Sequence, residues 1–127
     1  MFTKTKAFSG FSVDDLDQAR DFYGGILGLN VTEDNGMLGL HIADGGDILV
    51  YPKTDHAPAG FTILNFPVAD IDRAVDELTE RGVAFERYEG FEQDVKGIMR
   101  GQGPPIAWFK DPAGNVLSVI ESGSPRS

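Results

Sequence analysis

The chain contains the same segment twice, and this internal repeat limits the folds that it can adopt. The segment FSVDDLDQARD, residues 11–21, returns 55 residues later as FPVADIDRAVD, residues 66–76. Six of the eleven aligned positions are identical without a gap, and Leu16 and Ile71 are a close apolar match. The identical pairs are Phe11/Phe66, Val13/Val68, Asp15/Asp70, Asp17/Asp72, Ala19/Ala74 and Asp21/Asp76. The sequence therefore predicts two modules of the same structure within one chain.

Each copy has the pattern of a strand, a helix cap and an amphipathic helix. Residues 7–13 and 62–68 alternate between apolar and polar side chains, which is the two-residue period of a strand. Asp15 and Asp70 can accept hydrogen bonds from the first free amides of a helix. Apolar residues then follow at helical spacing, with a glycine beyond each helix. The two apolar stripes are Leu16, Ala19, Tyr23, Ile26 and Ile71, Ala74, Val75, Leu78.

Short strand candidates follow each helix and complete a βαβββ pattern in each half. They are residues 29–32, 37–42 and 47–51 in the first half, and 83–87, 106–110 and 116–121 in the second. A second echo aligns GDILVY, which begins at Gly46, with GNVLSV, which begins at Gly114, at an offset of 68. The predicted fold class is therefore α+β, built from two βαβββ modules.

The length of 127 residues suits one domain that spans residues 1–127. Module one is expected at about residues 5–53 and module two at about 60–121, with a seam at about 53–60. The sequence contains no cysteine, which excludes disulfides, thiolate metal sites and a cysteine nucleophile.

Charge and hydropathy exclude two classes of partner. Eleven basic and twenty acidic side chains give a formal charge of −9, so a nucleic-acid partner is not expected. No apolar run approaches the roughly 20 residues of a membrane span, and no signal-peptide core follows the N-terminus. We therefore expect a cytoplasmic protein without a membrane partner.

The two halves differ at a long loop, residues 88–105, which contains four glycines. Long loops inside compact domains are often lids or binding loops. The glycine spacing does not match a phosphate-binding loop, and no Gly-Lys-Ser/Thr follows, so a nucleotide site is rejected.

The segments DLDQARDFYGGILGL, residues 15–29, and AWFKDPAGNVLSVIE, residues 107–121, together with the duplicated pattern, resemble the vicinal oxygen chelate superfamily. This superfamily includes glyoxalases, bleomycin-resistance proteins and extradiol dioxygenases, and the resemblance covers about residues 5–121. It implies a curled, eight-stranded, mostly antiparallel sheet around a cleft, with the helices on the convex face. Enzymes of the superfamily hold a divalent metal in that cleft.

The resemblance also locates the four positions that supply metal ligands in those enzymes. Here they are Phe8, Val50, Ile63 and Ser118. The first three cannot bind a metal, and a neutral serine is a poor sole ligand for a divalent ion. A shift of one residue at any of the four still gives no histidine or carboxylate. We therefore expect neither a metal nor another cofactor.

Strand alternation predicts a mainly apolar cleft with a few polar groups, which is typical of a small-molecule pocket. Asn65 and Ser118 are the polar groups, Tyr51 and Trp108 are aromatic walls, and the long loop contributes contacts. No catalytic residue is assigned. The predicted ligand-binding residues are Phe8, His41, Val50, Tyr51, Ile63, Asn65, Met99, Arg100, Trp108 and Ser118.

The two histidines leave alternatives open. His41, in the segment GLHIA, is either an ordinary strand side chain or a cleft group that works as a general acid or base. No carboxylate is paired with it from sequence alone. His56 is interpreted as a solvated linker residue. Serine catalysis by Ser118 is not favoured, because Gly-x-Ser-x-Gly is absent.

The leading hypothesis is a metal-independent, small-molecule-binding protein of the bleomycin-resistance type. It would sequester an apolar or aromatic organic ligand and form a homodimer. One alternative is a metal-independent lyase or isomerase that uses His41 or a loop carboxylate among Glu89, Glu92 and Asp94. A second alternative is a structural or dimerisation module without a ligand.

Overall fold

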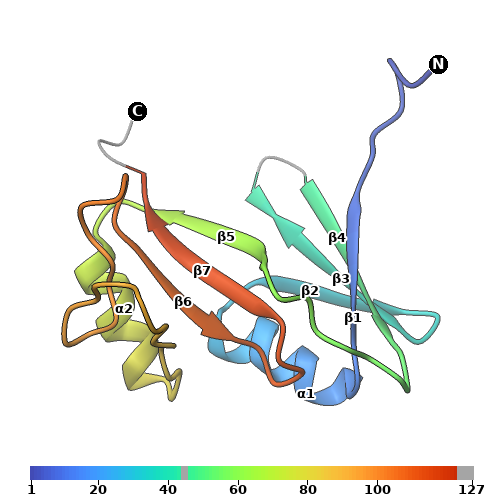
Figure 1. Cartoon of the computed structure of the whole chain (residues 1–127). Coiled ribbons are helices and arrows are strands. Elements are labelled where there is room, and N and C mark those ends of the chain that lie inside the picture. Colours follow the sequence, from blue (N-terminus) through green and yellow to red (C-terminus); the bar gives the residue numbers. More distant parts are fainter. Residues whose placement is uncertain (44–45, 123–127) are drawn as a thin grey trace. The chain divides into compact units, whose positions relative to one another are not determined.

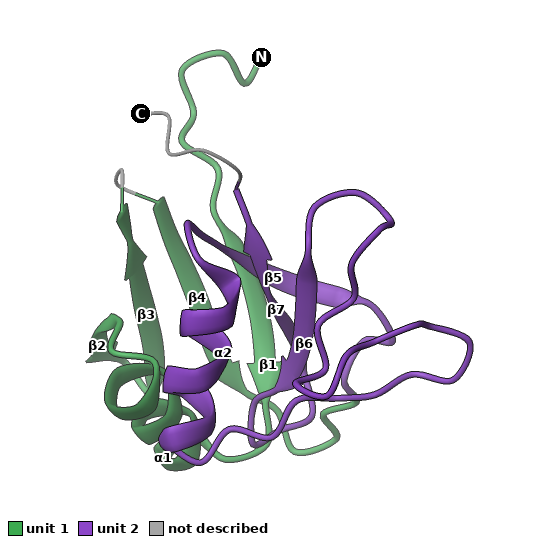
Figure 2. Cartoon of the chain, turned by 90° about the vertical axis from the view of Figure 1, so that its left-hand side faces the viewer, with its two compact units in different colours: residues 1–57 green, residues 58–127 purple. Residues whose placement is uncertain are grey.

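The computed structural model describes residues 1–43 and 46–122, and the last five residues of the predicted domain lie outside this part. The chain divides into two compact units, Met1–Ala57 and Pro58–Ser127, which Figure 2 shows in green and purple. The boundary between them falls in the stretch 53–60, where the repeat analysis places its seam. Within the described ranges, no helix is long and apolar enough to cross a membrane.

Unit 1 (residues 1–57) contains a four-stranded sheet (Figure 1). The strand order is β1-β4-β3-β2, with β1 and β4 parallel and the other pairs antiparallel. The elements are β1 (Ser9–Val13), α1 (Leu16–Arg20), η1 (Asp21–Ile26), β2 (Asn30–Asp34), β3 (Met37–Ile42) and β4 (Gly46–Pro52).

Unit 2 (residues 58–127) contains a three-stranded sheet with the order β5-β7-β6. The first and last strands, β5 and β7, are again parallel, and β6 pairs with β7 in antiparallel fashion. The elements are β5 (Thr62–Val68), α2 (Ile71–Glu80), β6 (Ile106–Lys110) and β7 (Val116–Glu121).

The α+β class is thus found, but one continuous eight-stranded sheet is not confirmed. The described ranges hold seven strands in two sheets. The strand expected at residues 83–87 makes only an isolated bridge, from Phe85 to Phe109. Beside it, the Gln93 side chain donates to Glu86 O and accepts from Tyr88 N. The Gln93 side chain thus hydrogen-bonds to backbone groups that would otherwise pair with a neighbouring strand.

The helix caps predicted from the repeat are confirmed. Asp15 Oδ1 accepts from Gln18 N, and Asp70 Oδ1 accepts from Arg73 N, each at 3.1 Å. The first helix then widens into a π-helical segment, η1, in which Leu27 N donates to Phe22 O. This segment contains the pair Gly24-Gly25, and glycine is a poor α-helix former.

Each sheet buries the face that its helix covers. In unit 1 the Phe11 ring lies 5.8 Å from the ring of Tyr23 in η1, so the helical side of β1 is fixed. In unit 2, α2 contacts β7 and contributes Ile71 and Val75 to the core. The buried sheet residues on these covered faces include Val13, Leu38, Leu40, Ile48 and Val50 in unit 1, and Ala107, Phe109, Leu117 and Val119 in unit 2.

The strand register corrects the second sequence echo by one residue. Phe11 pairs with Val50 in unit 1, and its repeat partner Phe66 pairs with Val119 in unit 2. Val50 therefore corresponds to Val119, and Leu49 corresponds to Ser118. The offset of 68 is wrong because it aligns two glycines with different roles. Gly46 belongs to strand β4, whereas Gly114 lies in a turn with φ of 89°.

The turn between β6 and β7 is built around a buried carboxylate. Asp111 is only 4% exposed, and its Oδ1 accepts from Ala113 N at 3.0 Å and from Asn115 N at 2.9 Å. Its Oδ2 accepts from the side-chain amide of Asn115 at 2.9 Å. The carboxylate therefore holds the sharp turn that delivers β7 to the centre of the sheet.

Replacement of Asp111 by alanine should lower the free energy of unfolding by about 1–3 kcal/mol, because buried donors of the turn lose their acceptor. Urea unfolding measures this loss. Asp34→Ala, at an exposed strand end, is the matched control and should change stability by less than about 0.5 kcal/mol. Equal effects of the two substitutions would contradict this account of the turn.

Candidate functional site

A row of side chains crosses the sheet of unit 2 on the face opposite the buried residues Leu117 and Val119. Ser118 of β7 is the register partner of both Asn65 in β5 and Trp108 in β6. The Ser118 hydroxyl donates to Asn65 Oδ1 at 2.5 Å, and Ser118 is fully buried. Ser118 therefore orients the exposed Asn65 amide and does not itself open to solvent.

A β-bulge in β5 adds a residue to this row that sequence reasoning missed. The register shifts between Thr62 and Leu64, so Ile63 is skipped in the pairing with β7. Trp108 Nε1 donates to Thr62 Oγ1 at 3.2 Å, which places Thr62 on the face of Ser118. Bulges break strict alternation and have no clear signature in this sequence. The strict alternation from which the common face of Ile63 and Asn65 was predicted is therefore interrupted at Ile63, and Thr62 joins the row.

Three aromatic side chains gather over this row, and we call Tyr88, Phe91 and Trp108 the ring cluster. The ring centroids of Tyr88 and Phe91 each lie 5.5 Å from that of Trp108, and they lie 5.9 Å from each other. Phe91 is 48% exposed, so part of this apolar surface meets solvent. Burial, with a smaller effect from the Glu86 charge, raises the pKa of Tyr88. Its hydroxyl therefore stays protonated at neutral pH.

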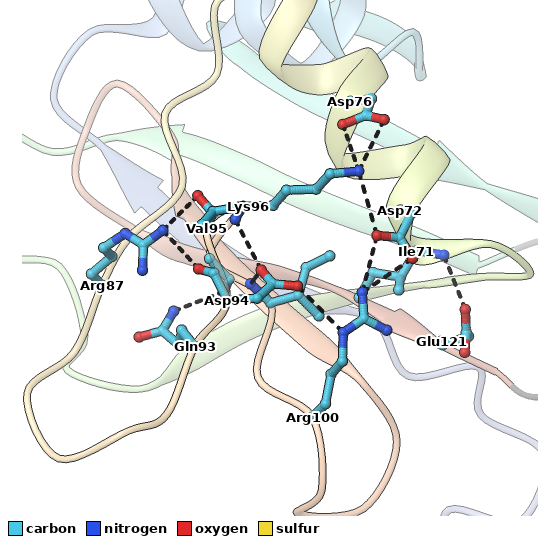
Figure 3. Close-up of polar contacts among 12 residues, drawn as sticks. Ile71, Asp72, Asp76, Arg87, Gln93, Asp94, Val95, Lys96, Arg100 and Glu121 are labelled. Carbon is cyan, nitrogen blue, oxygen red and sulfur yellow. Dashed lines mark hydrogen bonds and ion pairs between the residues drawn. The ribbon is translucent and has the colours of Figure 1, made fainter.

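The loop 88–105 is folded onto itself by side-chain to backbone hydrogen bonds (Figure 3). Gln93 Nε2 donates to Gly97 O at 2.8 Å, and Asp94 Oδ1 accepts from Lys96 N and Ile98 N at 2.9 Å each. Met99 forms isolated bridges with both Gln93 and Ile106. The loop therefore has a defined conformation without being a regular strand.

Ion pairs join this loop to α2 (Figure 3). Arg100 lies 3.0 Å from Asp72 and 3.3 Å from Asp94, and Lys96 lies 3.1 Å from Asp76. The hydrogen bond from Arg100 lowers the pKa of the Asp72 carboxyl, and it outweighs burial, which acts in the opposite direction. Burial disfavours the ionised form of Asp94, but backbone hydrogen bonds from Ile98 and Lys96, with Arg100, outweigh it and lower its pKa. Arg100, predicted as a ligand contact, is thus engaged in holding the loop.

Two loop residues predicted as ligand contacts line a surface hollow together with Phe91 of the ring cluster. The hollow has a volume of about 440 Å³ and lies beside the exposed Phe91. Met99 and Arg100 both line it, and their predicted role as ligand contacts stays a prediction. The lining residues are Gly90, Phe91, Glu92, Met99, Arg100 and Gln102.

The predicted site residues of unit 1 lie differently from expectation. Phe8 is 68% exposed and precedes β1. Val50 is fully buried on the helical face, so its predicted cleft orientation is wrong, because the echo was one residue out of register. Leu49 has the orientation expected of Val50. Tyr51 is 37% exposed and lies beside Gly10, on the face opposite the helices.

Both histidines have partners that the sequence did not reveal. His41 Nδ1 lies 2.9 Å from Asp47 Oδ1, and His41 Nε2 lies 2.9 Å from Thr32 Oγ1. The carboxylate is found only through the antiparallel register of β3 and β4, which places Asp47 opposite His41. His56 lies 2.6 Å from the Ser12 hydroxyl, so its interpretation as a solvated linker residue is wrong.

The profile of the Glyoxalase/Bleomycin resistance protein/Dioxygenase superfamily matches residues 9–119 of the chain. The chain belongs to this superfamily. It has no significant match among curated proteins.

Solved structures of this superfamily share its fold. A glyoxalase family protein from Enterococcus faecalis has 21% identity and a TM-score of 0.71, with 95% of this chain and 100% of that chain covered. A superfamily member from Sphaerobacter thermophilus has 24% identity and a TM-score of 0.67, with 92% and 98% covered. TnmS3, an antibiotic-binding protein from a Streptomyces species, has 22% identity and a TM-score of 0.65, with 94% and 98% covered.

The positions that hold metal ligands in enzymes of this superfamily do not fit a divalent ion here. With the corrected register they are Phe8, Leu49, Ile63 and Ser118. Three carry hydrocarbon side chains, and the Ser118 hydroxyl is already donated to Asn65. Among residues 1–43 and 46–122, no group of three or more His, Asp or Glu side chains is arranged to hold a metal. No step of a reaction can be derived through a metal at these positions.

Restoring the family glutamate at Ser118 should destabilise the protein in a pH-dependent way. Burial raises the pKa of a glutamate, so the folded state of Ser118→Glu would bind more protons than the unfolded state. Its stability should therefore be highest below the unfolded pKa of about 4.3 and fall as the pH rises.

The uncharged Ser118→Gln variant, of nearly equal size, is the control. The stability difference between the two variants, measured by urea unfolding at pH 4 and pH 8, should grow by about 1.4 kcal/mol per pH unit above 4.3 until the raised pKa is passed. A difference that does not change with pH would show that position 118 is hydrated.

Proposed function

We propose that the protein is a metal-independent binder of a small, flat, apolar or aromatic ligand, and that the ligand docks on the ring cluster of unit 2. The observation that carries this proposal is the exposed Phe91 ring, which extends the Trp108 surface toward the hollow lined by Met99. Stacking on aromatic rings suits flat ligands of many kinds.

The polar row beneath the ring cluster supports a defined ligand orientation. Because Ser118 donates to Asn65 Oδ1, the orientation of the Asn65 side-chain amide is fixed, and its amino group is not used by the Ser118 hydroxyl. Thr62 accepts from Trp108 Nε1, which fixes the indole ring. A few fixed polar groups beside a large apolar surface are the usual composition of a small-molecule site.

The metal-independent part of the proposal is supported by residue chemistry. The hydrocarbon side chains at Phe8, Leu49 and Ile63 supply no atom that could bind a metal. The neutral hydroxyl of Ser118 alone is too weak a ligand to hold a divalent ion. Among the similar folds, TnmS3 is described as antibiotic-binding, which supports sequestration as a function that this fold can serve. At 22% identity the likeness reaches only the fold.

A flat aromatic compound that binds at the ring cluster should quench the fluorescence of Trp108, the only tryptophan in the sequence. In a titration with a panel of such compounds, Phe91→Ala should weaken the binding of a hit about tenfold, because a stacking contact is lost. Phe2→Ala is the matched control, since Phe2 is 75% exposed and lies outside the ring cluster. Equal affinity of the wild type and Phe91→Ala would show that the ligand does not bind at the ring cluster.

Ligand binding should not require a metal ion. Protein purified without chelator should contain no stoichiometric zinc, nickel, manganese or iron by elemental analysis. EDTA should leave the affinity for the hit unchanged, since no carboxylate or imidazole is offered at the family positions. A stoichiometric metal that is needed for binding would refute the proposal.

A further inference from the structure

A second polar row crosses three strands of unit 1, on the face opposite its helices. Asp47 of β4 contacts His41 of β3, and His41 contacts Thr32 of β2, with both distances at 2.9 Å. The side chains of His41 and Asp47 are 37% and 60% exposed. The row is therefore a hydroxyl, an imidazole and a carboxylate in line, open to small molecules.

The hydrogen-bond chemistry of the row gives it a direction. An ionised carboxylate can only accept, so His41 must donate its Nδ1 proton to Asp47. The neutral ring then presents the lone pair of Nε2 to Thr32. The Thr32 hydroxyl therefore donates to Nε2, which is the arrangement that withdraws a proton from a nucleophile.

Gly39 keeps this arrangement open. A Cβ atom at position 39 would lie 3.0 Å from Thr32 Oγ1 and 3.5 Å from His41 Nε2. The first distance is tight, so the hydroxyl would have to shift by a few tenths of an ångström, whereas the second is an ordinary van der Waals contact. Because Gly39 is the register partner of Thr32, the missing side chain leaves space at the bond between hydroxyl and imidazole.

We propose that Thr32 is a nucleophile for acyl transfer from small activated esters, with His41 as its general base and Asp47 as the positioning residue. A nucleophile within hydrogen-bond reach of a base, which a third group orients, is the diagnostic geometry of such sites. The three residues all belong to unit 1, so the proposed reaction uses no residue of the ring cluster of unit 2.

The proposed reaction is balanced with water as the second substrate. Thr32 Oγ attacks the ester carbonyl carbon, and its proton passes to His41 Nε2. Collapse of the tetrahedral adduct breaks the bond to the leaving alcohol, which takes that proton from Nε2. Water then attacks the acyl-Thr32 ester by the same two steps and releases the carboxylic acid and the free hydroxyl.

The test uses the full chain and 4-nitrophenyl acetate. Wild-type protein should release 4-nitrophenolate and carry an acetyl group on Thr32 in peptide mapping by mass spectrometry. Replacement of His41 by alanine should lower the rate about a hundredfold. Thr32→Val keeps a β-branched residue in an exposed strand and should abolish the adduct. Thr32→Ser, which keeps a hydroxyl, should still be acetylated.

The second hydroxyl–imidazole pair of the chain provides the matched control. His56 and Ser12 lie 2.6 Å apart, and neither belongs to the row of Thr32, His41 and Asp47. His56→Ala and Ser12→Ala should leave the rate unchanged. Acetylation of Ser12 or of lysines in place of Thr32, or an unchanged rate in Thr32→Val, would overturn the proposal.

The positioning role of Asp47 is tested by the His41 tautomer. Nitrogen-15 NMR of the ring distinguishes a protonated Nδ1 from a protonated Nε2. The wild type should show the proton on Nδ1, and Asp47→Ala should lose this preference together with the ester activity. A purely structural Asp47 would leave the tautomer unchanged in Asp47→Ala, and that result would overturn its assigned role.

Discussion

Parallel pairing of the first and the last strand of each unit is the constraint on which the rest of this structure depends. The pairs β1–β4 and β5–β7 fix which side chains lie under a helix and which lie on the opposite face. A slip of one residue would exchange the two sets completely. The burial of Ser118, the position of Leu49 and the pairing of Asn65 with Ser118 all follow from these two pairings.

The repeat allowed much of the architecture to be predicted from sequence, because its signals are local. The aspartate caps, the alternating strands and the glycine-rich turns act within a few residues. Long-range register is less accessible: Val50 was assigned to the wrong face because Gly46 and Gly114 look equivalent in sequence. The skipped residue Ile63 shows the same limit, since the bulge leaves no clear pattern in the sequence.

The candidate site was predicted unevenly for a similar physical reason. Trp108, Asn65 and Met99 follow from strand alternation and loop position, and the structure brings Met99 and Phe91 to one hollow. Thr62 and Tyr88 belong to the candidate site because they contact Trp108, which is far from both in sequence. The Asp47 partner of His41 is likewise a cross-strand contact, visible only once β3 and β4 are in register.

The glycine at position 39 shows how two copies of one scaffold came to differ. Gly39 pairs with Leu49 in unit 1, and Trp108 pairs with Ser118 in unit 2, so Gly39 and Trp108 are equivalent in the repeat. The smallest side chain and the largest one therefore stand at equivalent positions of the two sheets. A duplicated fold can diverge by redistributing side-chain volume alone. One copy then has space beside the proposed Thr32–His41 pair, while the other presents the Trp108 ring of the proposed ligand-binding surface.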